Sequence, residues 1–143
     1  GEKVEVSNYA LLSSEGVSAY NHGANRIGVL VALSSNSDEA LQAGRDLAMQ
    51  IAAMNPIAVD ENAVSQEVKD KELEIGRDIA KQEGKPEEML DRIAQGKLKR
   101  FFKDNTLMNQ SYVKDSSMTV SAFLKSVSPD LEVKSFERFQ LGA

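Results

Sequence analysis

Residues 27–33 read Ile-Gly-Val-Leu-Val-Ala-Leu, and this short apolar run decides the fold class. A run of this length, bounded by polar residues, is typical of a strand that is covered on both faces. Before it, residues 17–22 and residues 4–12 each show the alternating pattern of a half-buried strand. Turn-forming residues at 13–16 and 23–25 separate the three segments. They predict three consecutive strands of an antiparallel sheet.

A helix is predicted directly after these strands, over residues 38–54. Residues 34–37 (Ser-Ser-Asn-Ser) offer side-chain oxygens for its N-cap, and Asp38 and Glu39 suit the positive end of the helix dipole. Apolar residues then recur at helical spacing, namely Ala40, Ala43, Leu47, Ile51 and Met54. The Asn-Pro pair at 55–56 ends the helix.

Two further helical patterns predict a hairpin. The first covers residues 60–83 and carries a narrow apolar stripe of Val64, Val68, Ile75 and Ile79. Gly84-Lys85-Pro86 follows, where Gly suits a left-handed C-cap and Pro the first position of the next helix. The stripe then resumes in Leu90, Ile93, Ala94 and Phe101. Because so narrow a stripe fits one partner helix, we predict an antiparallel hairpin over residues 60–104 that projects from the body as a short coiled coil.

The remaining residues predict a return to the sheet. Residues 104–117 are polar and rich in turn formers, and Val120, Phe123 and Leu124 mark a short helix that Pro129 closes. A last strand is indicated by Leu131, Val133, Phe139 and Leu141. The predicted fold class is α+β: an antiparallel three- to four-stranded sheet packed by helices, with the projecting helical hairpin. We expect one domain over residues 1–143, with residues 60–104 inserted in it.

Composition excludes several classes of function. The chain has 143 residues, 17 Lys and Arg against 22 Asp and Glu, a formal net charge of -5, one His and no Cys. Thiolate chemistry, Cys-type zinc sites and multi-His metal sites are therefore excluded, and no metal or cofactor is expected. The negative charge argues against direct nucleic-acid binding, and no apolar run approaches the roughly 20 residues that cross a bilayer. We expect a soluble, cytoplasmic protein.

His22 is the only side chain that would titrate near neutrality with an unperturbed pKa. No nucleophile elbow, zinc-binding helix or phosphate-binding loop accompanies it, so we do not expect an enzyme. Two interpretations remain besides catalysis: a histidine that satisfies its own turn, and a contact to a protein partner. The carboxylates between residues 60 and 91 suit a solvated face. The basic residues around Phe101 and Phe102 suit a helix C-terminus, and RNA stacking is the weaker alternative.

Five segments, in order along the chain, resemble the sequence of a known family. They are Ala-Tyr-Asn-His-Gly-Ala-Asn-Arg-Ile-Gly-Val-Leu-Val at 19–31, Met-Gln-Ile-Ala-Ala-Met-Asn-Pro at 49–56, Gly-Lys-Pro at 84–86, Gln-Gly-Lys-Leu-Lys-Arg-Phe-Phe at 95–102, and Leu-Met-Asn-Gln-Ser-Tyr-Val at 107–113. Together they cover nearly the whole chain, which resembles translation elongation factor Ts.

This resemblance implies guanine-nucleotide exchange on elongation factor Tu, with no covalent chemistry and no cofactor. The family's partner contacts fall on Gly1, His22 and Val113, with Lys114 beside the last. The family's N-terminal module and its Thr-Asp-Phe-Val motif are not found, so the chain resembles the C-terminal half of the core and is expected to be poor at exchange alone. The alternative is a scaffold or dimerisation module that forms a homodimer through the sheet.

Overall fold

The computed structural model describes residues 15–24 and 26–141. The strand predicted over residues 4–12 lies outside these ranges. The chain divides into two compact units, one made of residues 1–55 and 122–143 and the other of residues 56–121, and each is described by itself. Helices and antiparallel strands are mixed along the chain, which confirms the α+β class. The single-domain organisation stays a prediction.

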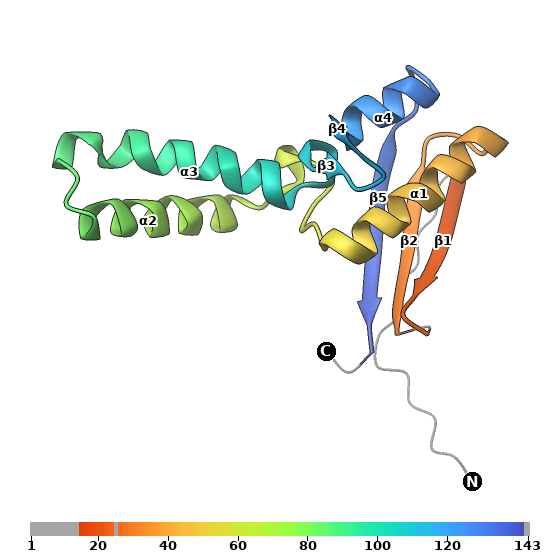
Figure 1. Ribbon diagram of the computed structural model, residues 1–143, viewed down its shortest axis with the longest axis horizontal. Coiled ribbons are helices and arrows are strands. Elements are labelled where there is room, and N and C mark those ends of the chain that lie inside the picture. The colour runs from red at the N-terminus through yellow and green to blue at the C-terminus, as the bar shows by residue number, and fades with distance from the viewer. Residues whose placement is uncertain (1–14, 25, 142–143) are drawn as a thin grey trace, which may run out of the picture. The chain divides into compact units, whose positions relative to one another are not determined.

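The first unit contains a three-stranded antiparallel sheet with the order β1-β2-β5 (Figure 1). Its strands are β1 (Gly16–His22), β2 (Ile27–Leu33) and β5 (Val133–Gln140). The hairpin of β1 and β2 and the final strand are confirmed. The apolar run of β2 forms the middle strand, and Val31 pairs with Ser18 on one side and Phe136 on the other. This central position explains why β2 has almost no polar residues.

Helix α1 (Asp38–Met54) packs on one face of this sheet and confirms the predicted helix. Ser37 caps it, since its Oγ accepts the N–H of Ala40 at 3.1 Å, and Asn55 ends it in the left-handed conformation. Its most deeply buried residues are Ala40, Ala43, Leu47, Ala48, Gln50, Ile51 and Ala52. Each large aliphatic side chain among them stabilises the fold by roughly 1.5–3 kcal/mol.

The second unit contains the helical hairpin of α2 (Gln66–Gln82) and α3 (Leu90–Asn105). The prediction that the first helix begins near residue 60 is wrong. Asp60 caps a separate 3-10 turn, Glu61–Ala63, and Ser65 caps α2 by accepting the N–H of Val68. Two consecutive caps therefore divide the predicted helix. The projection of the hairpin as a coiled coil stays a prediction.

The α2 side of the hairpin interface is made of small residues, which corrects that part of the predicted stripe, whereas the predicted Leu90 and Ala94 are buried in α3 together with Leu98. Gly76 and Ala80 are buried in α2, whereas Ile75 and Ile79 are each 39% exposed. A Cβ added to Gly76 would lie 3.1 Å from the Cα of Ala94, so the two backbones approach too closely for a large side chain between them. The helical spacing was correct, but the neighbouring face of α2 makes the contact.

The turn between the two helices is a Schellman motif. Gly84 is left-handed with φ 76°, the N–H of Lys85 donates to the carbonyl of Ala80, and the N–H of Gly84 donates to that of Lys81. The predicted C-cap is therefore confirmed. Pro86 does not occupy the first position of α3, because a 3-10 turn, Glu87–Met89, separates them.

Residues 104–117 contain more regular structure than the polar sequence predicts. A 3-10 turn, Leu107–Asn109, is followed by a small hairpin of β3 (Ser111–Tyr112) and β4 (Asp115–Thr119). Helix α4 (Val120–Val127) follows, as predicted.

Candidate functional site

His22 is the last residue of β1, at the turn that leads to β2. It pairs with Ile27, and Gly23 and Ala24 both adopt positive φ in the turn. The N–H of Arg26 donates to the carbonyl of Gly23 at 3.2 Å. The side chain of His22 is exposed. The turn therefore presents the imidazole to solvent from a strand whose backbone is fixed by pairing.

The hydroxyl of Tyr20 lies 3.1 Å from Nδ1 of His22. Their ring centroids are 6.0 Å apart, with an interplanar angle of 34°. Residues i and i+2 of a strand point to the same face, so both rings lie on one side of β1. Ser18 shares this side, and its Oγ donates to the carbonyl of Leu41 in α1 at 2.7 Å. The two rings therefore lie on the face of the sheet on which α1 packs.

This face of the sheet extends past the end of α1. Its last two rows are Tyr20–Val29–Arg138 and His22–Ile27–Gln140. Arg138 donates from Nη2 to the carbonyl of Ala52 at 3.2 Å, in the last turn of α1. In the next row, His22 and Gln140 are exposed and Ile27 is half-buried. His22 thus lies at an end of this face that is accessible among the described residues.

Val113 and Lys114 form the turn between β3 and β4, because the flanking residues Tyr112 and Asp115 pair with each other. Val113 is 44% exposed and Lys114 is exposed. Asp115 accepts the hydroxyl of Ser117 at 2.6 Å and its N–H at 3.1 Å, and these hydrogen bonds hold the pKa of the Asp115 carboxyl below its usual range. This turn thus presents an apolar and a cationic side chain beside a carboxylate.

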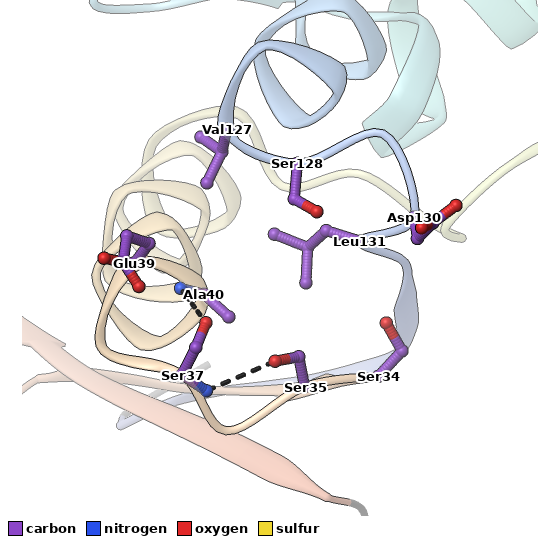
Figure 2. A pocket seen from close by; sticks show the side chains of 9 residues that line it. All are labelled: Ser34, Ser35, Ser37, Glu39, Ala40, Val127, Ser128, Asp130 and Leu131. Atoms are coloured by element: carbon purple, nitrogen blue, oxygen red, sulfur yellow. Dashed lines mark hydrogen bonds between the residues drawn. The ribbon is translucent and has the colours of Figure 1, made fainter.

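Figure 2 shows a pocket of the first unit, at the junctions of β2 with α1 and of α4 with β5. It encloses about 230 Å³ and is lined by Ser34, Ser35, Ser37, Glu39, Ala40, Val127, Ser128, Asp130 and Leu131. Three of the hydroxyl oxygens accept backbone N–H groups: Ser34 from Glu132, Ser35 from Ser37, and Ser37 from Ala40. These serines hold the chain where it enters α1, and the pocket follows from that packing.

Residues 15–24 and 26–141 contain one His and no Cys. Within them, no group of three His, Cys, Asp or Glu side chains could hold a metal ion. No helix in the same ranges is long and apolar enough to cross a membrane.

Comparison with known proteins gives one family over the full length. The family profile described as Elongation factor TS matches residues 1–143. The chain belongs to the elongation factor Ts family. It is 50% identical to elongation factor Ts of Christiangramia forsetii over 142 residues, which are 99% of this chain and 52% of that protein. Elongation factor Ts of Flavobacterium psychrophilum is 49% identical over 142 residues, again 99% of this chain and 52% of the relative.

A third relative, elongation factor Ts of Amoebophilus asiaticus, is 49% identical over 144 residues, which are 100% of this chain and 52% of that protein. The chain therefore spans about half the length of the curated relatives it matches. Membership in this family confirms the resemblance.

Of the four contact positions that the elongation factor Ts resemblance implies, Gly1 lies outside the described residues. His22 belongs to the first unit, and Val113 and Lys114 belong to the second. His22 ends β1 next to the turn that leads to β2, and Val113 and Lys114 form the turn between β3 and β4. Their assignment as partner contacts stays a prediction.

Tyr20 was missed by sequence reasoning, although a signal for it exists. The spacing Tyr-x-His in a predicted strand places both rings on one face, within reach of a hydrogen bond. Asp115 and Ser117 were missed for a different reason, since the segment that holds them was predicted to be irregular.

Proposed function

We propose that this chain is part of a guanine-nucleotide exchange factor that binds elongation factor Tu and promotes the release of GDP in the cytoplasm. Its family membership over residues 1–143 carries the proposal. No covalent bond is made or broken in this function, so the chain is not an enzyme in the strict sense and needs no cofactor.

Exchange follows from linkage between two binding equilibria. A factor that binds the nucleotide-free GTPase more tightly than the GDP form must weaken GDP binding by the same ratio. Coupling free energies of about 1–3 kcal/mol correspond to ratios of about 5 to 150. The factor therefore needs a surface that fits one state of the GTPase and not the other.

The partner contacts that we assign are His22 in the first unit, Val113 and Lys114 in the second, and Gly1. Three properties support the first three: each is exposed, each lies in a hairpin turn or directly before one, and the strands on both sides of that turn are paired. Paired strands limit the entropy that is lost when a turn docks. The imidazole supplies a hydrogen-bond donor, Val113 an apolar contact and Lys114 a positive charge.

We further propose that the chain is weak in exchange by itself and corresponds to the C-terminal half of the family core. The Thr-Asp-Phe-Val motif of the resemblance does not occur in its 143 residues, and the chain spans 52% of its relatives. A surface that lacks part of its contacts discriminates less between the two states of the GTPase.

Calorimetric titration of elongation factor Tu with the chain tests this proposal. One titration uses nucleotide-free GTPase and the other uses GTPase with saturating GDP and magnesium. Tighter binding to the empty form is expected, and His22→Ala should reduce the difference. Lys125→Ala, an exposed change in α4, is the matched control. Equal binding would show a docking module without coupling, and GDP release as fast as with an intact factor would refute the proposed weakness.

A dimerisation module is the second candidate. β1 is an outer strand of the sheet formed by β1, β2 and β5, and its Val17 is 40% exposed. Such an edge can pair with a second copy. Light scattering over a concentration series distinguishes the candidates, since this function requires a stable dimer together with no binding to either form of elongation factor Tu.

A further inference from the structure

Tyr20 and His22 form a pair in which the tyrosine ring is half-buried and the imidazole is exposed. Tyr20 is half-buried and lies in the same row as Val29, which is 2% exposed. His22 lies one row further out and is exposed. A hydrogen bond joins their side chains, with the Tyr20 hydroxyl 3.1 Å from Nδ1 of His22.

The surroundings of Tyr20 fix its ring more firmly than those of His22. Ser18, two residues before it on the same face, is 4% exposed and bonded to α1. Arg138, in the same row on β5, is bonded to the last turn of α1. The Tyr20 row and the row before it are therefore each bonded to α1, and the Tyr20 hydroxyl is a stable reference point for the exposed imidazole.

A neutral imidazole has one N–H donor and one acceptor nitrogen, and the partner of one nitrogen decides which is which. A hydroxyl that donates to Nδ1 leaves the proton on Nε2. The same bond restricts rotation about the Cβ–Cγ bond, so Nε2–H points away from Tyr20. An imidazole without this partner would exchange between two tautomers and two ring orientations.

We propose that Tyr20 is a positioning residue for His22: its hydroxyl donates to Nδ1, holds the Nε2–H tautomer and presents that N–H as a hydrogen-bond donor to the GTPase. The proposal rests on the proposed function, because it takes His22 as a contact to elongation factor Tu. Tyr20 itself needs no contact with the partner.

The first experiment observes the imidazole without any partner. Long-range ¹H–¹⁵N spectra of the ¹⁵N-labelled chain are recorded at about pH 8.5, roughly two units above the ordinary histidine pKa. A single Nε2–H tautomer is expected in the wild type and a mixture in Tyr20→Phe, which keeps the ring and removes the hydroxyl. Asn21→Ala, an exposed change between the two residues on the other face of β1, is the control and should leave the tautomer unchanged.

The second experiment is a double-mutant cycle for binding to nucleotide-free elongation factor Tu. Tyr20→Phe should weaken binding about 3- to 10-fold, the range expected when one side chain must be ordered on binding. In the His22→Ala background the same change should have no effect, because a positioning residue acts only through its target. A purely structural role of Tyr20 would weaken both backgrounds equally and would lower the thermal midpoint of the chain.

The outcomes separate this inference from the proposed function. An unchanged tautomer in Tyr20→Phe, or an equal loss of affinity in both backgrounds, overturns the positioning role while leaving exchange untouched. A changed tautomer with no effect of His22→Ala on binding overturns His22 as a contact, and with it the role of Tyr20 in binding. A changed tautomer together with a loss of affinity confined to the His22 background supports the inference.

Discussion

Replacing Gly44 by alanine should loosen α1 from the sheet that carries His22. A Cβ at Gly44 would lie 2.4 Å from Oγ of Ser18, 2.8 Å from its Cβ and 2.6 Å from Cδ1 of Leu33. Leu33 is fully buried, and the Ser18 hydroxyl already donates to the carbonyl of Leu41. The added methyl group therefore requires either the loss of this hydrogen bond or a movement of the helix.

The expected size of this effect follows from three opposing contributions. Alanine favours the helix interior over glycine by about 1 kcal/mol. Overpacking a tight contact costs roughly 1–3 kcal/mol, and loss of the Ser18 hydrogen bond costs about 1 kcal/mol. The free energy of unfolding should thus fall by about 1–3 kcal/mol. For a chain of this size, the midpoint of thermal unfolding should fall by roughly 3–10 °C.

Gly96→Ala is the matched control, because a Cβ at Gly96 in α3 would meet nothing within 4 Å. It should stabilise its helix by about 0.5–1 kcal/mol. The two glycines lie in different compact units, so circular dichroism should be combined with hydrogen exchange at Leu47 and Leu98, which report the two units separately. A Gly44→Ala variant as stable as Gly96→Ala would refute the argument from close packing.

Three further changes test other parts of the structure. Arg138→Met should lower the free energy of unfolding by about 1–2 kcal/mol, because Arg138 supplies a cation and a hydrogen bond at the C-terminal end of α1, whose last turn has no basic residue. Urea denaturation measures this change, and a free energy of unfolding equal to that of the wild type would contradict the prediction. Gly84→Ala should destabilise the helical hairpin by roughly 1–2 kcal/mol, because φ is 76° there; a thermal midpoint equal to that of Gly96→Ala would show that the turn tolerates a side chain. Ser117→Ala should raise the pKa of Asp115 toward its ordinary value of 3.8, as followed by carboxyl ¹³C shifts. Because folding lowers the pKa of Asp115, its contribution to stability is present above pH ~4 and is lost as the pH falls through the folded value, and this acid dependence should shrink in Ser117→Ala.

The features that the sequence predicted correctly depend on neighbours along the chain. Ser37 caps α1 with an N–H three residues away, and Asn55 ends the same helix. Gly84 ends α2 through bonds to residues of the preceding turn. The turn after His22 reverses the chain, so that β2 pairs with β1. In each case the decisive interaction spans only a few residues, so the local pattern contains it.

The features that were predicted wrongly, and those that no sequence pattern indicated, depend on the segments that pack against them. Nothing in α2 itself says that Gly76, and not Ile75, meets the second helix; the close approach of Ala94 decides it. The short strands β3 and β4 pair through a polar sequence that alone favours a loop.

The sequence by itself determined the family, the α+β class, both ends of α1, the glycine turn after α2 and the apolar strand at residues 27–33, because local spacing and motifs contain them. Only the tertiary structure decided that β5, from the far end of the chain, lies beside β2 and completes the face on which Tyr20 meets His22. Pairing between segments more than a hundred residues apart depends on side chains that become neighbours only when the sheet forms.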